Sequence, residues 1–193
     1  MSLNARDLLP DARDTPQSVR FSVRDYYKMA EVGVLSRDKR YELIRGVVLE
    51  TQPISPAHNY AVKSLSDQLS ACLGEDATVF APGPLQLDGD SEPQPDLLVL
   101  KPPAERYRER HPAASDVLLL VEVSNATLQT DRTTKLQLYA GAGIPEYWIL
   151  NLQKPQLEMH RDPDRQEARY REVKTLSEGE VAAFGSCEVA WWK

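Results

Sequence analysis

The sequence has no long hydrophobic run, few cysteines and no excess of basic residues. No stretch approaches the roughly 18 apolar residues that a membrane-spanning helix needs, so we expect no membrane partner. The first residues lack the apolar core of a signal peptide. Cys72 and Cys187 have no metal-binding spacing, so we expect two reduced thiols in a cytoplasmic protein. No internal repeat, phosphate-binding loop or glycine-rich dinucleotide turn is present, which argues against those classes.

The charge balance is acidic, with 23 Lys and Arg against 29 Asp and Glu and a formal net charge of −6. Lysine and arginine drive phosphate binding, so this balance argues against tight binding of DNA over the whole surface. The local field matters more than the total charge. The one compact basic stretch, residues 106–111, lies in a proline-bounded loop. It is open to two interpretations, a contact with a phosphate backbone or an ordinary solvated loop.

Length and composition predict one domain. The chain has 193 residues, with 41% hydrophobic and 27% charged residues, as in ordinary soluble domains. Residues 1–19 carry scattered charges and two prolines. We therefore expect a flexible N-terminal arm over residues 1–19 and a single domain over residues 20–193.

Local patterns predict the first elements of this domain. Ser22 followed by Asp25 resembles a capping box that opens a helix ending near Gly33. Residues 41–50 read as a β-hairpin that turns at Arg45-Gly46. Residues 79–87 read as two short strands interrupted by Pro82-Gly83-Pro84.

A longer helix is predicted from Ser55-Pro56 to Gly74. Its apolar residues fall on one stripe: Ala57, Ala61, Leu65, Leu69 and Cys72. His58 lies in the first turn. A metal or phosphate role is conceivable for it, but a partly exposed histidine at a helix end is the favoured interpretation.

Two apolar runs each carry one carboxylate near a strand end. Residues 97–100 follow Asp96, and residues 117–123 contain Glu122. Continuous apolar runs rich in Val and Leu are typical of strands covered on both faces. On neighbouring strands the two acids would lie close together and repel each other, by roughly 4 kcal/mol at about 4 Å. A hard cation such as Mg²⁺ would remove that repulsion. The alternative is structural, with each acid capping a helix or pairing with a lysine.

The segment after Glu122 reads as a crossover. Thr130 is a plausible N-cap for a helix that ends at Gly143, and residues 146–150 form the next strand. Strand, helix and strand in this order predict a parallel pair. Lys135 lies four residues after Asp131, on the same face of the helix. It either forms a surface pair with Asp131 or reaches back to Asp96 and Glu122.

The last part of the chain predicts further strands. Residues 156–160 and 169–173 alternate as half-exposed strands do. Trp191-Trp192 is apolar at the very end, and we expect it to pack on the domain or on a second subunit. A homodimer is therefore predicted.

Several short motifs occur together in one order. They are residues 40–46 (RYELIRG), Pro95-Asp96, residues 121–124 (VEVS), Asp131 with Lys135 and Tyr139, and residues 143–148 (GIPEYW). Over roughly residues 20–152 this set resembles the "putative restriction endonuclease" family. That family was formerly called a domain of unknown function and belongs to the PD-(D/E)xK nuclease-like superfamily.

The resemblance implies an α/β fold with a restriction-endonuclease-like mixed β-sheet core flanked by helices, here with extra C-terminal strands. It implies that Asp96 and Glu122, with the backbone carbonyl of Val123, bind Mg²⁺ or Mn²⁺. Glu42 and Lys135 would complete the catalytic set. The usual E-x-K element of the superfamily has its lysine where this chain has Ser124, and the resemblance implies that this family supplies the lysine from the next helix, at Lys135.

Two functions follow as alternatives. The first is a Mg²⁺-dependent endonuclease that hydrolyses phosphodiester bonds of nucleic acid, with DNA favoured as the partner. The second is a nuclease-like binding or dimerisation module with weak or absent catalysis. The acidic charge and Ser124 favour the second function. Asp96, Glu122 and Lys135 together favour the first. Fold alone does not decide between the two.

Overall fold

The computed structural model describes residues 18–51 and 53–192. The arm predicted for residues 1–19 lies outside these residues apart from its last two positions. The helices are α1 (Val23–Glu31), α2 (Pro56–Leu73), α3 (Leu128–Thr130) and α4 (Leu136–Ala142), with a π-helical segment at Asp131–Lys135 and 3₁₀ turns at Gly74–Asp76, Ala104–Tyr107 and Ala114–Asp116. The strands are β1 (Tyr41–Ile44), β2 (Val47–Glu50), β3 (Thr78–Phe80), β4 (Leu97–Leu100), β5 (Val117–Ser124), β6 (Glu146–Asn151), β7 (Gln156–Asp164), β8 (Arg169–Ser177), β9 (Ala182–Phe184) and β10 (Cys187–Val189).

Six strands form the central sheet in the order β3-β4-β5-β6-β7-β8. The β5–β6 pair is parallel and the other neighbours are antiparallel, so the sheet is mixed, and the predicted crossover is confirmed. Leu97 pairs with Val121 across β4 and β5. In an antiparallel pair the next positions along are Asp96 and Glu122. The register therefore places the two predicted acids opposite each other.

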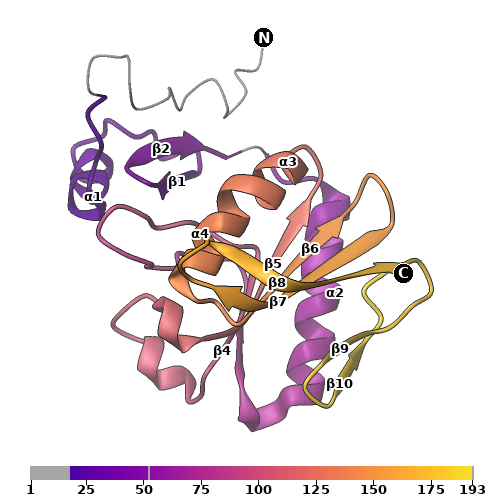
Figure 1. Ribbon diagram of the computed structural model, residues 1–193. Coiled ribbons are helices and arrows are strands. Elements are labelled where there is room, and N and C mark those ends of the chain that lie inside the picture. Colours follow the sequence, from indigo (N-terminus) through magenta and orange to yellow (C-terminus); the bar gives the residue numbers. More distant parts are fainter. Residues whose placement is uncertain (1–17, 52, 193) are drawn as a thin grey trace.

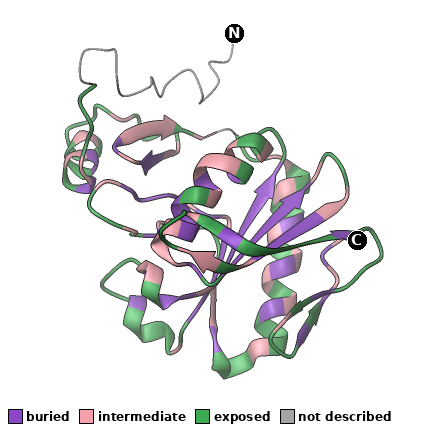
Figure 2. Ribbon diagram, viewed as in Figure 1, coloured by how far each residue is buried: buried purple, intermediate pink, exposed green. Residues whose placement is uncertain are grey.

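The sheet separates two hydrophobic cores because its side chains alternate between faces. Leu97, Val99 and Val121 pack on the side of α2, whereas Leu98 and Leu120 pack on the side of α4. The two helices cover opposite faces of the sheet (Figure 1). Burial is concentrated in the central strands, as Figure 2 shows. Across the described part of the chain, no helix combines the length and the apolar character needed to cross a bilayer.

The β1–β2 hairpin forms where the sequence predicts it. Arg45 and Gly46 both have positive φ, 48° and 75°, as a tight two-residue hairpin turn requires. A Cβ at Gly46 would lie 2.5 Å from the Cβ of Arg20. Glycine is therefore needed there both for its positive φ and for the lack of space for a side chain. Leu43 and Glu92 exchange backbone hydrogen bonds of 3.2 and 2.7 Å. This pairing fixes β1 against the segment that leads into β4.

The helix after β5 begins earlier than the sequence predicts. Thr130 was expected as the N-cap, but it is already helical and makes no side-chain capping bond, and α3 begins at Leu128. The π-helical segment then carries Asp131 and Lys135, and both are buried. Gly143 ends α4 in the left-handed conformation, as predicted.

The strands β7 and β8 run longer than the expected ranges, and only β3 forms in the region of residues 79–87, with Gln86 in an isolated bridge.

Trp191 is 4% exposed and packs in the α2 core of its own chain. Gln68 of α2 accepts a hydrogen bond from the backbone N–H of Ala190 at 2.9 Å and donates one to its carbonyl at 3.1 Å. The C-terminal segment is therefore held on α2.

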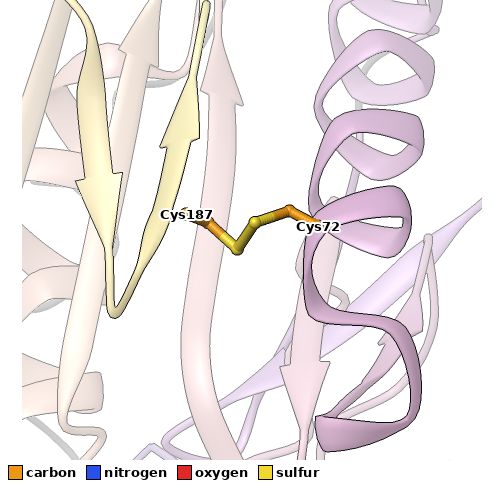
Figure 3. The surroundings of a disulfide bond; sticks show 2 residues. All are labelled: Cys72 and Cys187. Atoms are coloured by element: carbon orange, nitrogen blue, oxygen red, sulfur yellow. A yellow bond between two sulfur atoms is a disulfide. The ribbon is translucent and has the colours of Figure 1, made fainter.

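The expectation of two reduced thiols is wrong in this structure. Cys72, in the last turn of α2, and Cys187, at the start of β10, form a disulfide (Figure 3). Packing of the C-terminal hairpin on α2 brings together two residues separated by 115 positions. Such a long-range pairing leaves no mark in the local sequence.

Candidate active site

One pocket of about 730 Å³ collects all the predicted site residues. It lies where β1, the start of β4, the end of β5, the first turn of α2 and the π-helical segment meet. Its lining includes Glu42, Asp96, Glu122, Val123 and Lys135. The fold therefore brings together residues that are far apart in the sequence.

Lys135 is buried and makes two ion pairs. Its Nζ lies 3.0 Å from Oε1 of Glu122 and 3.1 Å from Oε2 of Glu42. The lysine is 7% exposed, which is far from the surface position that a pair with Asp131 would have. Among the described residues no Lys135–Asp131 ion pair is present. The structure therefore favours the interpretation in which Lys135 reaches back to the strand ends.

The two strand-end acids have different surroundings. Glu122 faces α4, and its Oε1 accepts hydrogen bonds from Lys135 and from the Tyr139 hydroxyl, the latter at 2.7 Å. Asp96 uses Oδ2 to accept the backbone N–H of Val123 at 2.8 Å. Within the described residues, Oε2 of Glu122 and Oδ1 of Asp96 have no hydrogen-bond partner in the protein.

His58 is, as predicted, a partly exposed histidine in the first turn of α2, and it also lines the same pocket. Its Nε2 lies 3.0 Å from Oδ2 of Asp96, and its side chain is 14% exposed. Its other ring nitrogen, Nδ1, is buried without a partner among the described residues. Ser55 caps α2 and accepts the backbone N–H of His58 at 3.2 Å, which fixes the first turn beside the strand end.

Asp131 is a further acid that the sequence did not place in the site. It is 1% exposed, and its Oδ2 accepts hydrogen bonds from Ser124 at 2.6 Å and Thr127 at 2.7 Å. Its Oδ1 is buried without a partner in the described part of the chain. Ser124, at the position of the usual lysine, thus binds an acid of the following helix.

The basic stretch 106–111 lies apart from this pocket. None of its residues is in the lining, and Arg110 pairs with Asp116 at 2.7 Å while its guanidinium lies over the Tyr107 ring. Arg110 is therefore committed to a structural contact. These contacts favour the interpretation of the stretch as part of a surface loop.

Burial and neighbouring charges shift the pKa values of three side chains in the site. Burial raises the pKa of Glu122 well above its usual value, and the nearby Asp96, Asp131 and Glu42 add to the effect while Lys135 opposes it. Burial also raises the pKa of Asp131. Burial alone would lower the pKa of Lys135, but Glu122, Glu42 and Asp131 together raise it well above the usual value. The pocket therefore places four carboxyl groups around one ammonium group, an excess of acidic over basic side chains.

The donor set fits a hard divalent cation. Asp96 and Glu122 each keep one oxygen without a protein partner, on neighbouring strands and in one pocket. Mg²⁺ retains several waters and needs one or two carboxylates, so two such oxygens suffice. No cluster of three acidic, His or Cys side chains is arranged as a ready metal cage among the described residues. A role for the Val123 carbonyl stays a prediction.

Comparison with known proteins identifies the family and the fold. The Uma2 family, described as "Putative restriction endonuclease", matches residues 23–188. No curated protein matches the chain. Among solved structures it is similar to one described as "a putative nuclease belonging to DUF820" from Anabaena variabilis ATCC 29413. The TM-score is 0.66 at 14% identity, over 86% of this chain and 90% of that one.

At this identity the structural likeness bears on the fold alone, whereas the family match spans most of the chain. The mixed α/β sheet with flanking helices and extra C-terminal strands is thus a nuclease-like fold. The predicted family is confirmed. This chain belongs to the Uma2 family of restriction endonuclease-like proteins.

Proposed function

We propose that this protein is a Mg²⁺-dependent endonuclease that hydrolyses phosphodiester bonds of nucleic acid, with DNA favoured as substrate. The observation that carries the proposal is the position of Lys135, buried between Glu42 and Glu122 in the pocket that also contains Asp96. A surface role for the lysine does not account for this burial. A migrated active-site lysine does.

The role proposed for each residue follows from the oxygen atoms or N–H donors that it leaves available to a metal ion or a phosphate. Asp96 and Glu122 would hold Mg²⁺, or Mn²⁺ in its place, and a bound ion would polarise the phosphate and lower the pKa of a bound water. Lys135 has three N–H donors; Glu122 accepts one of them, and Glu42 lies within ion-pair distance of the ammonium group. The remaining donor capacity and the charge of Lys135 would act on the phosphate oxygens, where charge develops. Glu42, which also accepts the Gln94 backbone N–H at 3.3 Å, holds Lys135 in this orientation.

The test is a titration with Mg²⁺ and Mn²⁺, followed by calorimetry and thermal unfolding. The wild type should bind the metal and gain thermal stability, and Asp96→Asn and Glu122→Gln should each lose that gain. Asp67→Asn is the matched control, because Asp67 is exposed and pairs with Lys63 on α2. Unchanged binding in both site variants would place the metal elsewhere.

Cleavage of duplex DNA, single-stranded DNA and RNA is then assayed with the same variants. Metal-dependent cleavage that is lost in Asp96→Asn supports the endonuclease. Metal binding without cleavage of any of these substrates would favour the alternative, a nuclease-like binding or dimerisation module. The observation that favours the binding or dimerisation module is that the described residues contain no cluster of three acidic, His or Cys side chains able to hold a metal ion.

Two further properties stay predictions. The homodimer loses the support of Trp191, which is buried in its own chain, and now depends on exposed apolar side chains near α1 such as Val19, Val32 and Val34. Sedimentation that shows monomer alone at micromolar concentration would contradict it. The cytoplasmic location loses its argument from reduced thiols, and fractionation of cells tests it directly.

A further inference from the structure

Arg40 is the one arginine that lines the pocket in the described part of the chain. It directly precedes β1, and its carbonyl accepts the backbone N–H of Thr51 at 2.9 Å, so its backbone is fixed at the hairpin. Its side chain is half-buried. Its Nη2 donates to Oε1 of Gln94 at a long 3.4 Å. Arg40, Gln94 and Asp96 all line the same pocket.

Gln94 is well placed to orient this arginine. Its side-chain amide donates to the carbonyl of Tyr41 at 2.9 Å, and its backbone N–H donates to Glu42. These bonds fix the amide, and therefore its oxygen faces Arg40. The orientation of Arg40 is connected in this way to the residue that holds Lys135.

The charge of Arg40 has no carboxylate partner among the described residues. Lys135, the other fully charged cation in the lining, is occupied by Glu42 and Glu122. Glu50, on the neighbouring strand β2, pairs instead with Lys39 at 2.8 Å. Arg40 therefore keeps most of its five N–H donors for a ligand.

The ligand that matches these donors is an anion with paired oxygens. A guanidinium binds phosphate in a bidentate manner, and an anionic substrate must also overcome the carboxylates that dominate this pocket. We propose that Arg40 binds a phosphate of the nucleic-acid strand next to the phosphate that lies at Asp96 and Glu122. This inference rests on the proposed function and assigns it a substrate-positioning residue.

The experiment measures binding of labelled DNA and RNA oligonucleotides by fluorescence anisotropy over a series of salt concentrations. Ca²⁺ is present because it takes the same kind of oxygen ligands as Mg²⁺. Arg40→Gln should weaken binding about ten- to a hundred-fold, as expected for loss of hydrogen bonds to a charged group. The slope of log affinity against log salt should become shallower by about one, since one phosphate contact is lost.

Two further variants sharpen the test. Arg40→Lys should keep the salt slope but bind more weakly than the wild type, because an ammonium group lacks the bidentate geometry. Arg24→Gln removes the same charge from an exposed position on α1 outside the pocket, and should leave affinity and slope unchanged. Calorimetry without nucleic acid should show wild-type metal affinity in Arg40→Gln.

The outcomes separate this inference from the function on which it rests. If the wild type binds nucleic acid and Arg40→Gln binds it with the same affinity and salt slope, the assignment of Arg40 is overturned and the nuclease proposal stands. If Arg24→Gln weakens binding as much as Arg40→Gln, a general charge effect replaces the assignment. If the wild type binds neither DNA nor RNA, the nuclease proposal itself fails, and the role of Arg40 fails with it.

Discussion

The hydroxyl of Ser124 donates a hydrogen bond of 2.6 Å to Oδ2 of Asp131. Ser124 is fully buried and stands two residues after Glu122, where the usual E-x-K element has its lysine. Its bond to Asp131 connects the end of β5 to the π-helical segment. Lys135 lies four residues after Asp131 in that segment and contacts Glu122. The departure at Ser124 and the position of Lys135 are therefore parts of one arrangement.

Replacing Lys135 tests whether this arrangement is functional. Lys135→Met removes the ammonium group from between Glu42 and Glu122 and leaves buried acids unpaired, so metal-free stability should fall by about 3 kcal/mol or more. Turnover should fall by about two orders of magnitude or more, because the donor to the transition-state charge is lost. Denaturant titration and single-turnover cleavage measure the two effects.

Lys63→Met is the matched control, because Lys63 forms an exposed pair with Asp67 four residues away on α2. It should change stability by no more than about 0.5 kcal/mol and leave turnover intact. Adding Ser124→Lys to Lys135→Met restores the usual placement of the lysine. Recovery of activity in the double variant would support migration, whereas full activity of Lys135→Met alone would contradict any catalytic role for Lys135.

Local patterns predicted much of the fold, because each depends on neighbours in the chain. The capping box at Ser22, the hairpin turn at Arg45-Gly46 and the Val- and Leu-rich β5 all form as expected. The acids of β4 and β5 could be placed together because antiparallel strands that are adjacent bring their opposite ends side by side. Helix periodicity left two interpretations of Lys135 open, and the resemblance to the family favoured the one in which it reaches the strand ends.

The features that were missed depend on contacts that no local pattern records. His58 reaches Asp96 only because α2 packs with its first turn at the start of β4. Asp131 became part of the site because the helix begins at Leu128 and contains a π-helical segment, which differs from the regular helix expected after Thr130. The Cys72–Cys187 disulfide depends on where the C-terminal hairpin packs.

The raised pKa of Glu122 predicts how metal-free stability depends on pH. The folded state holds a proton on this carboxyl above its ordinary pKa of 4.5, whereas the unfolded state releases it. Because the folded state binds more protons in that range, stability should fall as the pH rises above about 4.5 toward the raised pKa. Unfolding by denaturant at a series of pH values, in the presence of a chelator, measures this fall.

Glu122→Gln should flatten that pH profile, since its side chain does not titrate. Excess Mg²⁺ should flatten the profile of the wild type, because a cation favours the ionised carboxylate. A metal-free wild type whose stability rises steadily from about pH 5 to pH 8 would contradict the expected charge excess.

The disulfide predicts a redox-dependent stability. It closes a loop of 115 residues in sequence separation, so the unfolded chain is strongly constrained and the bond should contribute up to about 5 kcal/mol. Thermal unfolding should therefore show a lower midpoint for the wild type in reductant. The midpoint should approach that of Cys72→Ser, which should not respond to reductant itself. A wild-type midpoint that is the same in oxidant and reductant would contradict the bond.

His58 should act on the metal site through Asp96. Its Nε2 lies beside Oδ2, and with the Val123 N–H it fixes the carboxylate so that Oδ1 is left for a cation. Residues that orient a metal ligand commonly change metal affinity by about 10- to 100-fold when they are removed. His58→Ala should therefore weaken Mn²⁺ binding by about tenfold or more in calorimetry, while His58→Gln, which keeps an N–H donor, should recover part of the loss.

The control is His111→Ala, because His111 is exposed and stacks on Tyr27 outside the pocket. It should leave Mn²⁺ affinity unchanged. Calorimetry also separates positioning from general destabilisation, because a merely structural His58 would lower the unfolding midpoint of the metal-free protein without changing the affinity of the folded fraction. Wild-type Mn²⁺ affinity in His58→Ala would show that Val123 alone suffices to orient Asp96, and His58 would then have a packing role at the start of α2.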